Sequence, residues 1–305
     1  MYDIIVVGGG PAGLTAALYA ARAGKSVLVL EGETLGGQIA FAPQVDNYPG
    51  LPGMSGGEFA RQLTQQAEAQ GAEILPEPVT AMRTRDGLVE ITVPQARYTA
   101  RALILATGVS HRKLGLPGED ELVGAGVSYC AVCDGAFYRD RPVAVVGGGD
   151  TALQEALFLA QSCAQVTLIH RRDQFRGEHR LAEQVLRRDN IQVLLSHVPA
   201  ALLQEDGQLT GLKVRSVKDG REQVLAVDGL FAAVGQQPRN QIFANLVMTD
   251  DDGYFVVRED CSTSLPGVFA AGDCRAKPVR QLTTAVGDGA VAALSACRWV
   301  DAHGA

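Results

Sequence analysis

Short apolar runs alternate along this chain with longer segments of helical periodicity. The runs Ile4–Val7, Val27–Leu30 and Ala100–Ala106 carry few or no polar residues, and an alanine-rich segment leading to Gly24 separates the first two. Nearly continuous apolar strands are typical of a parallel sheet that is covered on both faces. Because such strands alternate with helices here, the pattern predicts a doubly wound α/β fold.

The same pattern predicts the remaining elements. Helices are expected at Glu58–Gln70, at His179–Arg188 and from about Thr283 to Val300, and the proline- and glycine-rich segment Gln44–Gly57 is expected to be an irregular loop. Further strands are expected at Glu73–Leu75, Thr80–Arg85, Val89–Val93, Val143–Val146, Val166–Ile169, Gln192–Leu195, Leu209–Ser216, Gly229–Val234, Tyr254–Val257 and from Val268.

Two of these strands run into glycine-rich turns of one type. The first turn contains Gly8, Gly10, Pro11, Ala12 and Gly13, and the second contains Gly147, Gly149, Asp150, Thr151 and Ala152. The first glycine permits a tight turn, the second lets the backbone approach a pyrophosphate, and a glycine or alanine at the third position lets the helix pack closely on the strand. A helix N-terminus then offers free N–H groups to the diphosphate. Because both copies continue through a helix to a second strand, we predict two Rossmann-like dinucleotide-binding domains rather than two ordinary turns.

The residues that end the second strand differ in charge between the copies. Glu31 stands in the first copy, where a carboxylate accepts hydrogen bonds from ribose hydroxyls. His170, Arg171 and Arg172 stand in the second, where a basic cluster suits a ribose that carries a 2′-phosphate. The two domains are therefore expected to bind different dinucleotides, one of them phosphorylated.

The order of the segments predicts that the second domain is inserted in the first. Proline-bearing linkers at Leu116–Gly118 and Gly235–Pro238 bracket the second copy. The tail has a single helix and cannot easily bury a core alone, so we expect it to return to the first domain. The predicted boundaries are residues 1–113, 114–239 and 240–305.

Composition excludes several classes of function. The chain has 305 residues, of which 47% are hydrophobic and 20% charged, which is usual for a globular protein of about two domains. Its net charge of −7 argues against a nucleic-acid partner. No apolar run approaches the ~20 residues of a membrane span, and the first strand begins too early to leave space for a signal peptide. A cytoplasmic protein is expected.

Cys130 and Cys133 form a Cys-x-x-Cys pair between the two glycine turns. The other cysteines, Cys163, Cys261, Cys274 and Cys297, are scattered, and no histidine pair has zinc-ligand spacing. Zinc normally needs such additional ligands, whereas an isolated pair in a reducing compartment is typical of redox chemistry. A redox dithiol is therefore favoured over a metal site or an accidental pair, and no metal is expected.

The complete set of motifs resembles that of the low-molecular-weight thioredoxin reductases over essentially the whole chain. Besides the two glycine turns, the residues that carry the resemblance are Gly36-Gly37-Gln38, Asn47-Tyr48-Pro49-Gly50, Ala106-Thr107-Gly108, Cys130-Ala131-Val132-Cys133-Asp134, His170-Arg171-Arg172 with Arg176, Gly272-Asp273 and Arg280-Gln281. A set of this size in this order is specific.

The resemblance implies the cofactors and their sites. Residues 1–113 and 240–305 would bind FAD, residues 114–239 would bind NADPH, and the active unit would be a homodimer. The FAD-binding residues would be Gly8, Gly10, Pro11, Ala12, Gly13, Glu31, Gly37, Gln38, Asn47, Thr107, Gly108, Gly272, Asp273, Arg280 and Gln281. The NADPH-binding residues would be Gly147, Gly149, Asp150, Thr151, His170, Arg171, Arg172 and Arg176. The helix that follows Gln281 would direct its N-terminus at the flavin.

The resemblance also implies a thioredoxin-disulfide reductase. Electrons would pass from NADPH through FAD to the disulfide of Cys130 and Cys133, and then to oxidised thioredoxin or a similar small disulfide protein. Cys133 would lie next to the flavin, Cys130 would exchange with the substrate disulfide, and Asp134 would act as acid and base for the thiols. The dipeptide Asp134-Gly135 can equally be a simple turn.

Alternatives of the same fold are a ferredoxin- or flavin-linked reductase, a dithiol oxidase, and a protein that binds dinucleotides without turnover. The retained dithiol and basic cluster favour the reductase. Because the dithiol and the second glycine turn lie in one insertion and both must reach one flavin, we expect this insertion to rotate, with hinges near Lys113–Gly118 and Gly235–Arg239.

Overall fold

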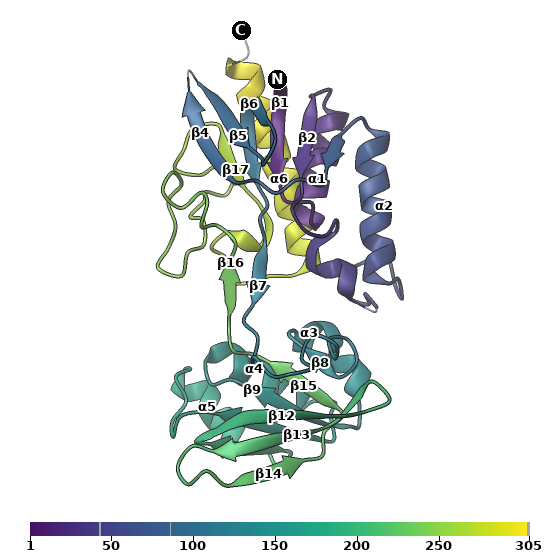
Figure 1. Cartoon of the computed structure of the whole chain (residues 1–305), viewed down its shortest axis with the longest axis vertical. Coiled ribbons are helices and arrows are strands. Elements are labelled where there is room, and N and C mark those ends of the chain that lie inside the picture. Colours follow the sequence, from purple (N-terminus) through teal and green to yellow (C-terminus); the bar gives the residue numbers. More distant parts are fainter. Residues whose placement is uncertain (43, 86, 304–305) are drawn as a thin grey trace. The chain divides into compact units, whose positions relative to one another are not determined.

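The computed structural model describes residues 1–42, 44–85 and 87–303 and divides the chain into two compact units (Figure 1). Unit 1 comprises residues 1–110 and 237–305, and unit 2 comprises residues 111–236. Unit 2 is therefore inserted in unit 1. Both units are built on parallel sheets, which confirms the predicted α/β fold.

Unit 1 contains a sheet with the order β3-β2-β1-β6-β5-β4, and β17 pairs with β6 as well. Its parallel strands are β1 (Tyr2–Val7), β2 (Val27–Leu30), β3 (Glu73–Leu75), β6 (Arg97–Leu105) and β17 (Val268–Ala270), and β4 (Ala81–Arg85) and β5 (Leu88–Thr92) are antiparallel. Val268 of β17 is paired with Leu103 of β6, so the tail of the chain completes the sheet that its first residues begin.

Helices cover one face of this sheet. They are α1 (Pro11–Arg22), α2 (Gly56–Ala69) and α6 (Leu282–His303), with the 3₁₀ turns η1 (Gly37–Phe41) and η3 (Gly272–Cys274). A Cβ atom on Gly289 of α6 would lie 2.2 Å from the carbonyl oxygen of Ala12, which shows how closely α6 packs on α1. Small side chains on both helices allow this approach, and the buried core between them and the sheet is rich in alanine.

Unit 2 contains a parallel sheet with the order β11-β10-β9-β15-β8 and a separate antiparallel sheet with the order β12-β13-β14. The strands are β8 (Val127–Ser128), β9 (Pro142–Val146), β10 (Gln165–His170), β11 (Ile191–Leu195), β12 (His197–Glu205), β13 (Gln208–Ser216), β14 (Glu222–Leu225) and β15 (Gly229–Ala232). The helices are α3 (Ala131–Asp134), the 3₁₀ turn η2 (Gly135–Tyr138), α4 (Asp150–Leu159) and α5 (His179–Leu186).

The chain passes between the units through two short strands, β7 (Val109–His111) and β16 (Gln236–Pro238), which pair with each other. Both strands lie at the boundaries of the units. Among the described residues, no helix is both long and apolar enough to cross a membrane.

One expected strand is wrong. Tyr254–Val257 does not form a strand, because Phe255 makes only isolated bridges, to Thr249 and to Arg275. The ring of Phe255 is instead fully buried against Phe243 on the face of the sheet opposite the helices. Core burial rather than strand pairing therefore explains the apolar character of this segment. The strands β7, β8, β12, β14 and β16 and the short helical elements η1, α3, η2 and η3 were not expected.

Candidate functional site

The first glycine turn joins β1 to α1 in unit 1. Gly8 has a φ of +106°, and a Cβ atom there would lie 2.2 Å from the carbonyl oxygen of Ala106. Gly13 is equally constrained, because its Cβ would lie 1.9 Å from the oxygen of Gly8. Gly10, in contrast, has no atom closer than 3.9 Å to the position of a Cβ. Two glycines thus serve the protein's own packing, whereas Gly10 faces open space.

Helix α1 begins at Pro11 without a capping side chain. Its N-cap residue, Gly10, makes no side-chain hydrogen bond to the first turn, and Ala12 follows Pro11 in that turn. The free N–H groups and the positive end of the helix dipole are suited to an anionic group. The structure therefore places Gly10, Pro11 and Ala12 together at a surface that can hold a diphosphate.

Glu31, directly after β2, contacts the first glycine turn through its side chain. Its Oε2 accepts a hydrogen bond from the N–H of Gly9 at 2.6 Å, and its Oε1 accepts one from the N–H of Glu33 at 2.8 Å. The carboxylate is thereby held beside the glycine turn. A carboxylate at this place, with lone pairs still available, is suited to accept ribose hydroxyls.

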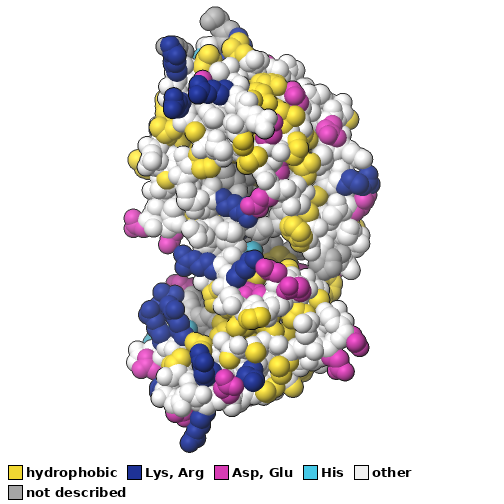
Figure 2. Space-filling view, viewed as in Figure 1, with side chains coloured by type: hydrophobic (Ala, Val, Ile, Leu, Met, Phe, Trp, Pro, Cys, Tyr) yellow, Lys and Arg dark blue, Asp and Glu magenta, His cyan; other side chains and the backbone are white. Residues whose placement is uncertain are grey.

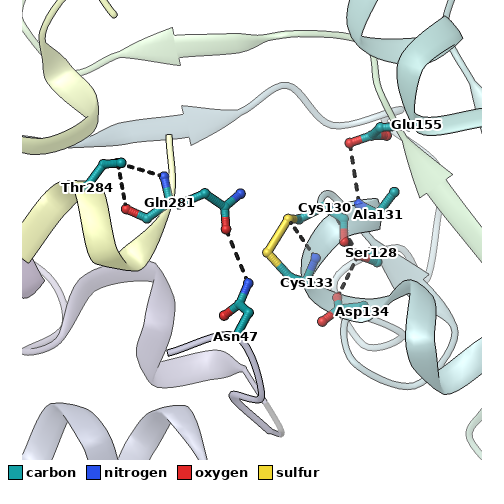
Figure 3. Close-up of a disulfide and its surroundings, with 9 residues drawn as sticks. All are labelled: Asn47, Ser128, Cys130, Ala131, Cys133, Asp134, Glu155, Gln281 and Thr284. Atoms are coloured by element: carbon teal, nitrogen blue, oxygen red, sulfur yellow. Dashed lines mark hydrogen bonds between the residues drawn. A yellow bond between two sulfur atoms is a disulfide. The ribbon is translucent and has the colours of Figure 1, made fainter. Parts of the chain in front are cut away.

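The other residues expected at this site lie on several segments of unit 1. The side-chain amide of Gln38 on η1, next to Gly37, donates to the carbonyl oxygen of Val109, just after Gly108. Asn47 donates to the side-chain oxygen of Gln281 at 3.2 Å, so the loop after η1 is joined to the residue that precedes α6. Figure 3 shows this amide pair.

Thr107 leads to a residue that the sequence analysis missed. Its hydroxyl donates to Oδ1 of Asn240 at 2.8 Å, and Nδ2 of Asn240 donates to the carbonyl oxygens of Gly253 and Cys274, both at 2.9 Å. Asn240 is only 2% exposed. It therefore fixes Thr107 relative to the turn that carries Gly272 and Asp273. Asn240 stands next to the predicted linker and in no recognised motif, so no local pattern indicates its role.

Asp273 lies on η3 among cationic side chains. Its Oδ1 is buried without a hydrogen-bond partner, and Nζ of Lys277 lies 3.6 Å away. Burial raises the pKa of Asp273 above its ordinary value, although Lys277 and Arg280 lower it. Arg280 donates to the backbone oxygen of Asp273 at 3.2 Å and lies 4.0 Å from the ring centroid of Tyr254. A buried acceptor without a partner is suited to a ligand hydroxyl.

The second glycine turn, in unit 2, resembles the first in its packing. A Cβ atom on Gly147 would lie 2.4 Å from the oxygen of Ala233 and 2.6 Å from Cβ of Ala152, so packing requires glycine there. No atom lies within 4 Å of the corresponding position on Gly149, which is the uncapped N-cap residue of α4. Of the first helical residues, Asp150 accepts the N–H of Glu178 at 2.6 Å, and Thr151 is exposed.

His170, which is expected among the NADPH-binding residues, is buried at the second glycine turn. The ring is only 5% exposed and lies between Gly148, whose Cβ would come within 2.2 Å of Nδ1, and Phe175, on which it stacks at 5.8 Å. Burial lowers its pKa, and the neighbouring arginines lower it further. The imidazole is therefore neutral near pH 7 and supports the glycine turn.

Arginine side chains supply positive charge at the second turn. Arg171, Arg172 and Arg176 are exposed, and the backbone of Arg176 donates to the oxygen of Gly148 at 2.7 Å. Figure 2 shows Lys and Arg side chains gathered on the side of unit 2 that carries α5. Three guanidinium groups close to an open helix N-terminus can bind a phosphate ester with charge-assisted hydrogen bonds.

The two cysteines of the predicted pair form a disulfide in unit 2 (Figure 3). Cys130 is the N-cap residue of α3, and its Sγ accepts the N–H of Cys133 at 3.2 Å. Cys130 is partly buried and Cys133 is exposed. The remaining four cysteines are free and buried. A hydrogen bond to sulfur favours the thiolate, so the geometry favours ionisation at Cys130 after reduction.

Asp134 is held beside this disulfide by Ser128. The hydroxyl of Ser128 donates to Oδ2 of Asp134 at 2.6 Å, and the hydroxyl oxygen of Ser128 accepts the N–H of Cys130 at 3.0 Å. Burial raises the pKa of Asp134, although the bond from Ser128 lowers it. A carboxyl group that protonates more readily than usual is suited to exchange protons with thiols.

Comparisons with known proteins agree along the whole chain. The family model described as pyridine nucleotide-disulphide oxidoreductase matches residues 2–289. Thioredoxin reductase of Listeria monocytogenes is 42% identical over 301 residues, which cover 99% of this chain and 94% of that protein. Thioredoxin reductase of Listeria innocua is 40% identical over the same shares of the two chains.

Solved structures show the same similarity. The crystal structure of thioredoxin reductase from Streptococcus pyogenes is 39% identical, covers 99% of both chains and has a TM-score of 0.95. That of Lactococcus lactis thioredoxin reductase in the FR conformation is 37% identical, covers 99% of this chain and 100% of that chain, and has a TM-score of 0.69. Identity and coverage are nearly equal for these two relatives, but the TM-scores are not. The two relatives therefore differ from each other in overall arrangement.

Proposed function

The chain belongs to the pyridine nucleotide-disulphide oxidoreductase family, and we infer from this membership and from its full-length relatives that it is an NADPH-dependent thioredoxin-disulfide reductase. It is a flavoprotein that uses FAD and NADPH. The observation that carries this function is the Cys130–Cys133 disulfide, because it lies in the same unit as one of two dinucleotide-type turns. A protein that only binds dinucleotides has no use for such a disulfide.

We propose that unit 1 holds FAD. Gly10 and the uncapped start of α1 would face the pyrophosphate, and Glu31 would accept ribose hydroxyls. The unpartnered Oδ1 of Asp273 would accept a hydroxyl of the ribityl chain. When bound, FAD supplies a two-electron carrier between NADPH and the disulfide. The isoalloxazine end would be held by the segments that carry Arg280, Gln281, Asn47 and Gln38. Hydrogen bonds of these side chains already connect those segments within unit 1.

We propose that unit 2 holds NADPH at its glycine turn. Gly149 leaves space for the pyrophosphate at the start of α4, where Thr151 can add a hydroxyl donor. Arg171, Arg172 and Arg176 would bind the 2′-phosphate, while His170 keeps the turn in shape. NADH lacks the group that these arginines recognise, so NADPH should be preferred.

Once reduced, the Cys130–Cys133 pair transfers the electrons to the substrate disulfide. Two electrons break the Sγ–Sγ bond of Cys130 and Cys133 and leave two thiolates, which take up protons. We propose that the Cys130 thiolate attacks the thioredoxin disulfide and that Cys133 then attacks Cys130 to release reduced thioredoxin. The hydrogen bond from the Cys133 N–H to Sγ of Cys130 supports this order, because it favours the Cys130 thiolate. Cys133 is left for the flavin side, and Asp134 would exchange protons with the pair.

We further propose that unit 2 changes its orientation during each cycle. One insertion carries both the disulfide and the NADPH turn, and both must reach the flavin of unit 1. The paired linker strands β7 and β16 lie at the unit boundaries, where hinges are expected. The spread of TM-scores from 0.95 to 0.69 among solved relatives supports such mobility in the family.

We also propose a homodimer in the cytoplasm. Reduced buried thiols and a net charge of −7 are consistent with that compartment. Sedimentation of the purified holoenzyme tests the dimer, and fractionation of cells that produce it tests the location.

The experiment that tests the function follows NADPH oxidation with purified thioredoxin as acceptor. The expected result is flavin bleaching on NADPH addition, and steady turnover when thioredoxin is present. A glutaredoxin serves as the comparison acceptor. Bleaching by reduced ferredoxin but not by NADPH would instead identify a ferredoxin-linked reductase. If neither donor bleaches the flavin, the protein is a dithiol oxidase.

A further inference from the structure

Glu155 is a second acid beside the redox disulfide. It lies on α4, and its Oε1 accepts the N–H of Ala131, the first residue of α3, at 3.4 Å. Figure 3 shows its carboxyl group directed at this N–H, next to Cys130, whereas the side chains of Asp134 and Ser128 lie on another side of α3. The other oxygen, Oε2, is buried without a hydrogen-bond partner. The acid therefore contacts the backbone of the disulfide segment itself.

Packing on α4 explains why this carboxyl group is enclosed. Gln154, the preceding residue, is exposed, and Ala156, the following one, is fully buried, so Glu155 lies where the helix turns toward the interior. Burying a carboxyl group with a single long hydrogen bond is unfavourable for folding. A residue retained under that cost is a candidate for a functional role.

Few charges face Glu155 from the elements packed on α4. Besides the cysteine pair, the ionisable side chains of those elements are Asp134 on α3, Tyr138 on η2, His170 on β10, and His179, Arg180 and Glu183 on α5, and β9 has none. Asp134 is held by Ser128, and His170 is buried. On α5, His179 and Arg180 are exposed and Glu183 is partly exposed. The charges that change during turnover on the elements packed on α4 are therefore those of the cysteine pair and of Asp134, the acid that would exchange protons with the pair.

The ionisation of Glu155 falls in the working range of the thiols. Burial raises its pKa to about 7, although the N–H of Ala131 lowers it. The carboxyl group is therefore partly protonated at neutral pH. Like charges disfavour each other, so an ionised Glu155 opposes a thiolate on α3 and a neutral Glu155 does not.

We propose that Glu155 is a positioning residue of the redox pair, which holds the first N–H of α3 and controls, through its own charge, how readily the Cys130 and Cys133 thiols ionise. This rests on the proposed function, in which the disulfide cycles. Two electrons supplied through the flavin break the Sγ–Sγ bond and give two thiolates. One proton from solvent neutralises a thiolate, and a second protonates Glu155 when it is ionised, so that one thiolate remains with little change of local charge.

The test is the alkylation of the reduced holoenzyme with iodoacetamide between about pH 5 and pH 9, with the labelled cysteines read by peptide mass. Glu155→Gln is compared with Glu183→Gln, which removes the same charge from an exposed site of unit 2. We expect Glu155→Gln to shift the rate profile to lower pH by roughly one unit, as removal of a neighbouring like charge does. Glu183→Gln should leave the pH dependence of the alkylation rate unchanged. Glu155→Asp keeps the carboxyl group, so its pH dependence should be close to that of the unmodified enzyme.

An unchanged profile in folded Glu155→Gln overturns the proposal. If that variant does not fold, the pH profile of the unmodified enzyme still tests the proposal. The profile must contain a second inflection near the pKa of Glu155. A single inflection, from the thiol alone, contradicts the proposal. The assay uses neither NADPH nor thioredoxin, so its failure is distinguishable from a failure of the reductase function.

Discussion

The hydroxyl of Ser128 donates to Asp134 at 2.6 Å and accepts the N–H of Cys130 at 3.0 Å. One side chain thus joins the acid to the first residue of the redox disulfide. Because burial raises the pKa of Asp134, its carboxyl group is protonated more easily than usual and is suited to accept and return a thiol proton.

The first prediction concerns this acid. Asp134→Asn should lower the rate of thioredoxin reduction by about 10²-fold or more, since general acid–base catalysis contributes at least this much. Flavin reduction by NADPH should remain unchanged. Rapid mixing with NADPH alone, and then with thioredoxin, separates the two steps. Asp219→Asn, at an exposed turn of the same unit, is the matched control, and equal loss in both variants would refute a special role for Asp134.

The second prediction uses two glycines of one turn. Gly149→Ala should raise KM for NADPH about tenfold or more with little loss of thermal stability, because its Cβ meets no protein atom within 4 Å and would project into the proposed pyrophosphate site. Gly147→Ala should destabilise the protein by about 1–3 kcal/mol, because its Cβ would overlap Ala233 and Ala152. Melting curves and NADPH titrations of both variants test this, and an unchanged KM in Gly149→Ala contradicts the placement.

The third prediction concerns cofactor choice. Replacing Arg171 and Arg172 by alanine should lower kcat/KM for NADPH by about 10²-fold, since hydrogen bonds between charged groups contribute about 1.5–3 kcal/mol each. The value for NADH should stay nearly constant. Arg187→Ala, an exposed arginine paired with Glu183 on the same unit, is the control. An equal loss with both cofactors would place the 2′-phosphate elsewhere.

The fourth prediction concerns stability and pH. The pKa of Glu155 is raised from 4.5 to about 7 in the folded protein, so its contribution to stability is fully present below about pH 4.5 and is lost as pH rises through 7. The full loss is on the order of 3 kcal/mol. As pH rises between these values, the free energy of unfolding of the oxidised enzyme, measured with urea, should fall less in Glu155→Gln than in the unmodified enzyme. A parallel pH dependence in the two proteins would contradict the shift.

Strand and helix positions that depend on local pattern could be predicted from the sequence. The two glycine turns could be predicted because the backbone there permits only certain residue types, and those types are visible in the sequence. Gly13 is an example, since a Cβ atom at this position would lie 1.9 Å from the oxygen of Gly8. The disulfide was found because its two cysteines are neighbours in the chain.

Features that depend on distant packing could not be predicted. Strand β12 is half-buried along most of its length and has no clear alternation, and Phe255 is apolar because it fills a core and not because it belongs to a strand. His170 looked like part of a basic cluster, but Gly148 has no side chain and leaves space for its ring. Asn240 and Glu155 bond to segments far away in the sequence, and no local pattern indicates either contact.

The central claim is that electrons leave the flavin through Cys130 and Cys133. The most direct measurement compares Cys130→Ser and Cys133→Ser with the unmodified enzyme, by following flavin absorbance after mixing with NADPH and then the steady reduction of thioredoxin. We predict that NADPH bleaches the flavin in all three proteins and that thioredoxin turnover falls by about 10³-fold or more in both variants, because disulfide exchange requires both thiols. Normal thioredoxin turnover by either variant would contradict the account.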